Sequence, residues 1–355
     1  MKKYTTVELF KGGFLMKAAV WYGERDIRIE ERETKELQPN DVKVKVAWAG
    51  ICGSDLHAYL HPGSVPINMN TVMGHEFSGE IAEVGSHVTK FKKGDRVCIY
   101  PMMLKDPSNA EIERFITLDA VGAQIDGGFA EYVILPQKTI FKIPDHLPLE
   151  LAAMVEPAAV SFQSIKDSNV REGDTVVVYG AGPIGLFAVL GAKAAGASNI
   201  IVIDLFDSRL DKATEMGATH VFNAKEVNPV EEIRKLFPGG ADVAIEAAGV
   251  ESTFNQAIQS TKVRGTMMVI SFHTQDIQFN VPASLIFSGA KLMGSVGYSN
   301  ETYNEVIELF ANGRLPAQSI ITSKIDIDNI AEQGFEALIH DKSQAKILVK
   351  LSGAH

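Results

Sequence analysis

The chain has 355 residues, of which 46% are hydrophobic and 22% charged, and its formal net charge is −10. This length exceeds what one compact core commonly holds, so we expect a globular protein of two domains. The acidic balance argues against nucleic acid or an anionic membrane as a partner.

Two cysteines cannot build a disulfide framework, which favours a reducing compartment, the cytoplasm. No apolar run approaches the roughly 20 residues that span a bilayer. A strand-like pattern begins only at Met16, and the codons of Lys11–Gly13 can spell a ribosome-binding site before it. We therefore predict that residues 1–15 are a disordered extension or a non-native start. Removing them should leave activity and melting temperature unchanged.

Short strands broken by Gly, Pro and Asp occupy the chain from Met16 to about Lys142. Val42–Val46 alternates apolar and charged residues, as a half-buried strand does. Gly79–Gly85, Gly94–Ile99 and Phe129–Leu135 are further strand-and-turn segments. Many short strands with this punctuation predict a small β-barrel-like domain.

Strands alternate with helices after about Pro157. The segments 174–179, 199–204, 241–246 and 266–271 are buried strands, which indicates a parallel, doubly wound sheet. A helix is expected at 305–312, and a last strand at 345–350 should return to the first domain. The predicted domains are 16–160 with 303–355, and 161–302.

A glycine loop joins the first of these buried strands to an apolar helix. Gly180 permits the turn, Gly182 lets the backbone approach a pyrophosphate, and Gly185 allows close helix packing. Asp204 ends the next strand, where its carboxylate would bind the adenosine ribose and favour NAD over NADP; Arg209 could soften that preference. The alternative is a plain glycine turn with Asp204 capping a helix. The predicted cofactor residues are Gly180, Gly182, Pro183, Ile184, Gly185, Asp204 and Arg209.

A second group of residues carries the chemistry of a zinc site. Its members are Cys52, His75, Glu76 and Glu156. Zinc takes sulfur, nitrogen and oxygen ligands, and a catalytic site leaves one position open. Ser54 and His57 follow closely and could carry a proton away from a bound alcohol. Alone, Cys52 or His75 would most often be a packed core residue, but the combination favours a metal.

Together these motifs resemble those of the zinc-dependent medium-chain alcohol dehydrogenases. The matching segments are Gly50–His57, Gly74–Gly79, Gly94–Val97, Gly127–Tyr132, Val155–Pro157 and Gly180–Gly185. Val155–Pro157, Leu292–Tyr298 and Glu332–Leu338 are similar to the polyol and 2,3-butanediol branch. The resemblance implies an α/β protein, with a GroES-like β-barrel catalytic domain and a Rossmann domain that binds the dinucleotide.

The resemblance also implies the roles of single residues. Cys52, His75 and Glu156 would bind the catalytic zinc. Glu76 would be a fourth or alternating ligand, or a partner outside the ligand shell. Ser54 would receive the alcohol proton, and His57 would pass it to solvent through the cofactor ribose. Asp55 would orient a ligand, although it could simply cap a helix.

The chain departs from the family at the lobe that often holds a second, structural zinc on four cysteines. Pro101–Gln124 contains none, so we expect one zinc per chain and a lobe that packs on its own chain or on a partner subunit. Its apolar positions are Met102, Met103, Leu104, Ile112, Phe115, Ile116 and Leu118. Cys98 is predicted to be a small buried hydrophobe.

The predicted reaction is reversible hydride transfer between NAD and a secondary alcohol, a vicinal diol such as 2,3-butanediol or its ketone acetoin. Phe129 and Tyr59 are candidates for the apolar pocket wall. One alternative is a sorbitol-like polyol or polyol-phosphate dehydrogenase. Another is a catalytically silent dinucleotide-binding protein. We expect a homodimer or homotetramer with no nucleic-acid or membrane partner.

Overall fold

The structure is a computed structural model that describes residues 14–105, 110–116 and 119–352. Of the predicted extension, residues 1–13 lie outside this part. The last two residues of the predicted extension, Phe14 and Leu15, are described. The first strand begins at Leu15, and the Thr34 amide donates a hydrogen bond to the Phe14 carbonyl. No helix of the described residues is long and apolar enough to cross a membrane.

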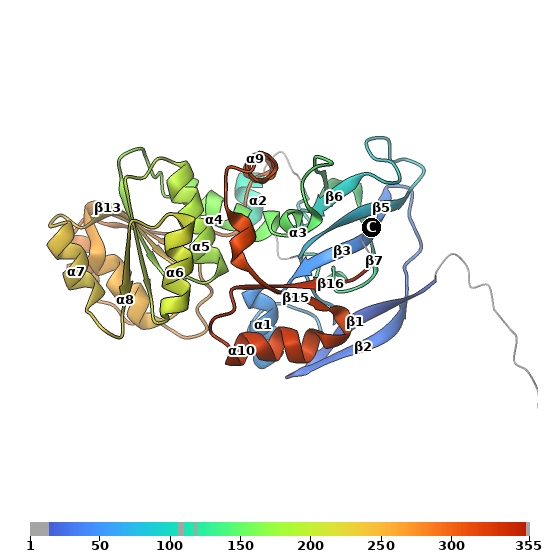
Figure 1. The fold of residues 1–355 in the computed structure, drawn as a ribbon, viewed down its shortest axis with the longest axis horizontal. Helices are drawn as coiled ribbons and strands as arrows, with labels where there is room; N and C mark the ends of the chain where they lie inside the picture. The colour runs from blue at the N-terminus through green and yellow to red at the C-terminus, as the bar shows by residue number, and fades with distance from the viewer. Residues whose placement is uncertain (1–13, 106–109, 117–118, 353–355) are drawn as a thin grey trace, which may run out of the picture.

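The molecule has two halves, which lie side by side in Figure 1. The barrel half contains a seven-stranded sheet in the order β15-β16-β3-β5-β6-β8, with β7 also paired to β3. Its strands are β3 (Asp41–Gly50), β5 (Glu76–Val84), β6 (Arg96–Ile99), β7 (Tyr132–Pro136), β8 (Ile140–Lys142), β15 (Ile321–Asp326) and β16 (Lys346–Lys350). A smaller sheet joins β1 (Leu15–Gly23), β2 (Asp26–Glu33) and β4 (Thr71–Val72).

The last strand confirms its predicted return to the first half of the chain. β16 pairs antiparallel with β3, with Leu348 opposite Gly50. Short helices complete this half: α1 (Gly53–Leu60), α2 (Ala110–Ile116), α3 (Leu149–Ala152) and α10 (Ala337–His340). The C-terminal strand therefore lies beside the turn that carries Cys52.

The other half is a six-stranded sheet in the order β11-β10-β9-β12-β13-β14, and all of its strand pairs are parallel. Its strands are β9 (Thr175–Tyr179), β10 (Asn199–Asp204), β11 (His220–Asn223), β12 (Ala241–Glu246), β13 (Thr261–Val269) and β14 (Lys291–Gly294). Its helices are α5 (Pro183–Ala194), α6 (Asp207–Met216), α7 (Pro229–Leu236) and α8 (Glu251–Ser260). The central strands are continuous apolar runs because helices cover the sheet faces (Figure 1).

The strand order reverses at β9, between β10 and β12, which is where doubly wound sheets bind ligands. Gly180 directly follows β9 and has φ +99°, a conformation that L side chains rarely adopt. A Cβ at Gly185 would collide with the Gly180 carbonyl. Gly182 caps α5, so the free amides of the helix face the edge of the sheet.

The two halves share a hydrophobic core around α4 (Val155–Asp167) and α9 (Asn300–Ala311). Cys98 is fully buried in that core, and burial raises the pKa of its thiol to about 12. It is therefore the small buried hydrophobe that was predicted. The boundary residues of the two domains stay a prediction.

Candidate active site

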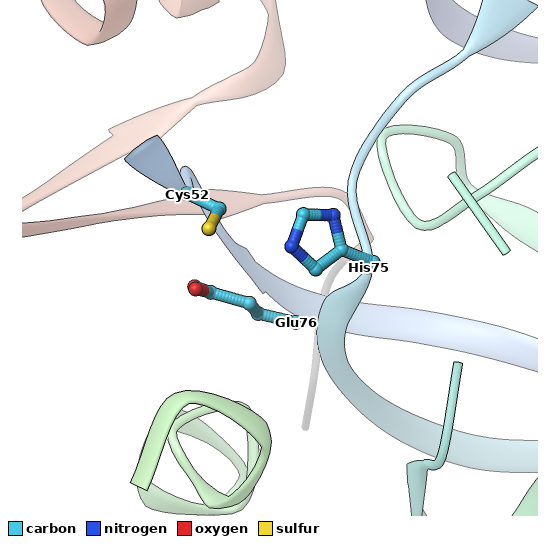
Figure 2. Close-up of side chains that lie close together, drawn as sticks. All are labelled: Cys52, His75 and Glu76. Atoms are coloured by element: carbon cyan, nitrogen blue, oxygen red, sulfur yellow. The ribbon is translucent and has the colours of Figure 1, made fainter. Parts of the chain in front are cut away.

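Strand pairing brings three candidate metal ligands together. Cys52 is the N-cap of α1 and lies two residues after β3, while Glu76 begins β5 and His75 directly precedes it. β3 and β5 are antiparallel neighbours with Gly50 opposite Glu76, so both turns lie at one end of the sheet. Ligand atoms of the three side chains all lie within 4.8 Å of one another (Figure 2).

Asp55 lies beside His75 on the side away from this group. The Asp55 carboxylate is fully buried; its Oδ2 accepts the Cys52 amide at 3.0 Å, and its Oδ1 lies 3.6 Å from His75 Nδ1. The other ring nitrogen of His75 is turned toward Cys52 and Glu76 (Figure 2). Burial disfavours the charged ring most strongly, but the charges of Asp55 and Cys52 outweigh it and raise the pKa of His75 well above its usual value. This carboxylate–histidine pair is typical of metal sites.

Lys346 is a site residue that the sequence analysis missed. Its ammonium group, from β16, lies 2.8 and 2.5 Å from the two carboxylate oxygens of Glu76 and 3.0 Å from the Ile51 carbonyl oxygen. Both side chains are almost fully buried, at 2% and 0% exposure. Lys346 lies 270 residues from Glu76 in the chain, so no local pattern connects them. The Glu76 carboxylate can therefore be neutralised in two ways, by the Lys346 ammonium group or by a metal ion bound with Cys52 and His75.

Glu156 reaches the same region from α4 but stands apart from the group of three. Its Oε1 accepts a hydrogen bond of 2.8 Å from the Tyr298 hydroxyl. Burial raises the pKa of Glu156 to about 7; His75 lowers that pKa and Glu76 raises it. The ligand role of Glu156 stays a prediction, as does the choice between ligation and support for Glu76.

One cavity of about 340 Å³ joins the metal group to the glycine loop. Its polar lining comes from the barrel half and from α4: Cys52, Ser54, His57, His75, Glu76, Glu156 and Lys346. The nucleotide-binding half contributes Gly182, Pro183, Ile184, Ala247, Ala248, Ile270, Ser271 and Phe272. A dinucleotide on the loop and a ligand at the metal group would therefore meet in one space.

Ser54 and His57 lie on α1 and both line this cavity, three residues apart and so on one face of the helix. Burial, and then the charge of His61, lowers the pKa of His57 below its usual value. The predicted wall residues Phe129 and Tyr59 are not among the residues that line this cavity, because both are buried in the barrel core.

Asp204 ends β10 as predicted, and its carboxylate supports the glycine loop. Oδ2 accepts the Ala181 amide at 2.8 Å, and Oδ1 accepts the amides of Leu205 and Phe206. Arg209 lies 3.7 Å from Asp204 Oδ2 and donates to the Lys342 carbonyl. The structure therefore places the acid at the loop, and its contact with a ribose stays a prediction.

Glu246 is a second buried acid that the sequence analysis did not single out. It is fully buried at the end of β12, where Oε1 accepts the amides of Ala248 and Gly249 and Oε2 lies 3.0 Å from His273 Nε2. Ser271 also donates to Oε2. Glu246 thereby ties together two loops that form one wall of the cavity.

The lobe without cysteines, residues 101–124, has buried apolar side chains in its first part and exposed ones in α2. Leu104 is 3% exposed, and Met102 packs against the shared core, so this part packs on its own chain as predicted. Ile112, Phe115 and Ile116 are 58%, 50% and 69% exposed. Leu118 lies outside the described residues.

The sequence matches two family models. Residues 38–145 match the alcohol dehydrogenase GroES-like domain, and residues 183–312 match the zinc-binding dehydrogenase family. Together they cover both the barrel strands that carry the metal group and the sheet that carries the glycine loop.

Curated relatives and a solved structure are similar over nearly the whole chain. The (R,R)-butanediol dehydrogenase of Bacillus subtilis is 39% identical over 94% of this chain and 99% of its own length. The sorbitol dehydrogenase of the same organism is 35% identical over 94% and 97%. The crystal structure of 2R,3R-butanediol dehydrogenase from Bacillus subtilis superposes with a TM-score of 0.89 over 95% of this chain and 100% of that one. The chain therefore belongs to the zinc-binding alcohol dehydrogenase family, in the branch of the butanediol and sorbitol dehydrogenases.

Proposed function

We propose that the protein reversibly oxidises a secondary alcohol of a vicinal diol, such as 2,3-butanediol, with NAD as the hydride acceptor. The observation that carries this proposal is the single cavity shared by the metal group and the glycine loop. A hydride can pass only between groups in contact, and a common cavity puts donor and acceptor together.

Cys52, His75 and Glu76 would hold the zinc ion. Their sulfur, nitrogen and oxygen donors fit its preferences, and Asp55, whose Oδ1 lies 3.6 Å from His75 Nδ1, would support the ring orientation that ligation requires. Bound there, zinc supplies a Lewis acid that favours ionisation of a coordinated alcohol. Glu156 would complete or alternate in the ligand set from the opposite side.

Ser54 and His57 would remove the alcohol proton. Both line the cavity, and the lowered pKa of His57 keeps its ring neutral, and so able to accept a proton, near neutral pH. Ser54 would take the proton first, and His57 would pass it to solvent through the cofactor ribose.

The glycine loop would hold the pyrophosphate of the cofactor on the amides at the start of α5, with Gly180, Gly182, Pro183, Ile184 and Gly185 around it. Asp204 is a buried anion at the end of β10, where it would accept the ribose hydroxyls and repel a 2′-phosphate. This arrangement favours NAD, with Arg209 as a moderating cation beside the acid.

The apolar part of the cavity lining includes Val160, Ile270 and Phe272, which suits the methyl ends of a short diol. The more identical relative, named a butanediol dehydrogenase, supports the same choice. The test is NAD reduction with the butanediol stereoisomers, sorbitol, xylitol and threonine. Higher kcat/KM for sorbitol would make the protein a polyol dehydrogenase. Zinc content with no NAD reduction on any substrate would indicate a catalytically silent protein.

A second copy of this chain is the proposed protein partner. Within the described residues β14 pairs only with β13, so its outer edge is open there. Leu292 and Met293 of β14 are exposed, as are Val263 of β13 and Val281, Ile286 and Phe287 of the segment that joins the two strands. An open apolar edge favours pairing with an identical edge about a twofold axis. Light scattering after Phe287→Glu should show loss of the homodimer or homotetramer.

The proposed compartment is the cytoplasm. Both cysteines are free thiols in the described residues, which suits a reducing environment.

A further inference from the structure

Tyr298 contacts Glu156 from the protein side of the cavity. Its hydroxyl donates to Glu156 Oε1 at 2.8 Å, and Tyr298 is 1% exposed. Glu156 lines the cavity, whereas Tyr298 is not among its lining residues. The tyrosine therefore restrains one carboxylate oxygen from behind and leaves Oε2 without this restraint. A glutamate has several rotatable bonds, so such a contact narrows the orientations of its carboxylate.

Two other buried tyrosines hold Tyr298 in place. Its carbonyl oxygen accepts the Tyr100 hydroxyl at 2.8 Å, and the Tyr100 ring meets the Tyr298 ring edge-on at 5.1 Å between centroids. Tyr303 stacks on the Tyr298 ring, with 5.3 Å between the centroids. The Tyr303 hydroxyl donates to the Ile99 carbonyl at 2.6 Å. The phenol of Tyr298 thus has little freedom to turn away from Glu156.

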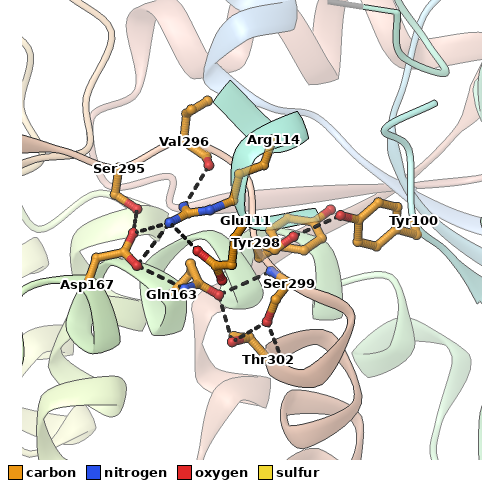
Figure 3. A network of polar contacts seen from close by, with 10 residues as sticks. All are labelled: Tyr100, Glu111, Arg114, Gln163, Asp167, Ser295, Val296, Tyr298, Ser299 and Thr302. Atoms are coloured by element: carbon orange, nitrogen blue, oxygen red, sulfur yellow. Dashed lines mark hydrogen bonds and ion pairs between the residues drawn. The ribbon is translucent and has the colours of Figure 1, made fainter. Parts of the chain in front are cut away.

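The chain around Tyr298 is anchored on both sides (Figure 3). Ser295 donates to Asp167 Oδ2 at 2.7 Å, and the Val296 carbonyl accepts from Arg114 at 3.0 Å. On the other side the Ser299 amide donates to Gln163 Oε1 at 3.1 Å. Residues 295–299 join β14 to α9, so this link between the two halves is fixed by side chains of α4 and α2.

Arg114 and Asp167 form the strongest of these anchors. Arg114 is 4% exposed and donates to both carboxylate oxygens of Asp167, at 3.0 and 2.9 Å. Both contacts come from one nitrogen, Nη2, and they are charge-assisted hydrogen bonds, which are shorter and stronger than neutral ones. Arg114 belongs to the lobe 101–124, which has no cysteines, so an ion pair attaches this lobe to the rest of the molecule.

We propose that Tyr298 is a positioning residue for Glu156: its hydroxyl aims the carboxylate at the metal group, and the Arg114–Asp167 ion pair fixes Tyr298 through residues 295–299. The proposal rests on the proposed function, because it requires zinc at Cys52, His75 and Glu76. Residues that orient metal ligands by hydrogen bonds commonly contribute about 10–100-fold in metal affinity or activity.

The test compares Tyr298→Phe with Tyr303→Phe. Both changes remove one buried hydroxyl from the same ring stack, but only the first hydroxyl touches Glu156. The measurements are zinc affinity by chelator competition, the visible spectrum of the cobalt-substituted protein, kcat, and KM for NAD. Tyr298→Phe should lower zinc affinity or kcat about 10–100-fold and shift the cobalt spectrum, with KM for NAD unchanged. Tyr303→Phe should leave all four near wild type.

Equal zinc affinity, kcat and cobalt spectra in the two variants would overturn the role of Tyr298. A wild-type protein that binds no zinc and oxidises no diol would instead refute the proposed function, so the two failures are distinguishable. Arg114→Met tests the anchor: it should weaken zinc binding in the wild-type background and add little in the Tyr298→Phe background. The same loss in both backgrounds, or none in either, would overturn the link through residues 295–299.

Discussion

The metal group and the glycine loop face one cavity, yet they are built in different ways. The loop is local: Gly180, Gly182 and Gly185 lie within one strand–turn–helix unit, and their supporting acid, Asp204, ends the next strand. The metal group is not: two turns supply its ligands, and Lys346 comes from the far end of the chain. The loop depends on backbone shape, whereas the metal group depends on buried charges that must balance.

This contrast predicts that a ligand change destroys one site and spares the other. Cys52→Ser should lose zinc, and with it NAD reduction should fall to background, because a hydroxyl is a far poorer zinc ligand than a thiolate. NAD binding, measured by fluorescence titration, should stay near wild type, since the loop lies on the other half. A variant with full zinc content and normal turnover would remove Cys52 from the site.

The charge balance itself is tested by Lys346→Met. The change leaves Glu76 buried without its cation, which should destabilise the zinc-free protein by about 3–5 kcal/mol. The measurement is denaturant unfolding with and without zinc, and the loss should be smaller with zinc because the metal then neutralises the carboxylate. The matched control is Lys346→Met with Glu76→Gln, which removes both charges and should recover much of the stability. Equal stability of wild type and Lys346→Met would contradict the buried pair.

The proton path should appear in the pH profile of alcohol oxidation. The ring of His57 must be neutral to accept a proton, and its pKa is lowered, so kcat should hold near neutral pH and fall only below that lowered pKa. His57→Gln should reduce kcat by about 100-fold and abolish this acid-side fall, with partial rescue by added imidazole. His61→Gln is the control: it should keep kcat near neutral pH and the acid-side fall, which should move to higher pH because the charge of His61 no longer lowers the pKa of His57. An unchanged profile in His57→Gln would exclude it from the path.

The smallest expected effect concerns cofactor choice. Asp204→Ala should raise KM for NAD about tenfold and relax discrimination against NADP, because a hydrogen bond to a charged group contributes roughly 1.5 kcal/mol or more. Zinc content should not change. Asp204→Asn can still accept the Ala181 amide and separates loop support from charge. The same NAD-to-NADP ratio in all three proteins would leave Asp204 with a purely structural role.

Much of this architecture could be predicted because its signals are local. The apolar run 174–179, the glycines after it and the acid at the end of the next strand all occur where the structure places β9, the loop and β10. The alternation of Val42–Val46 marks a real strand, and the absence of cysteines in the lobe 101–124 is plain from the chain. Short-range patterns of this kind reflect backbone geometry and burial, which act within a few residues.

The sequence by itself determined which chemical groups the protein has and which elements carry them. Only the tertiary structure decided how those groups are partnered: Lys346 on Glu76, Tyr298 on Glu156, and Glu246 across two loops. It also buried Phe129 and Tyr59 in the barrel core. The physical reason is that a buried charge or hydroxyl must find a partner, and the partner is chosen by strand pairing and packing rather than by distance along the chain.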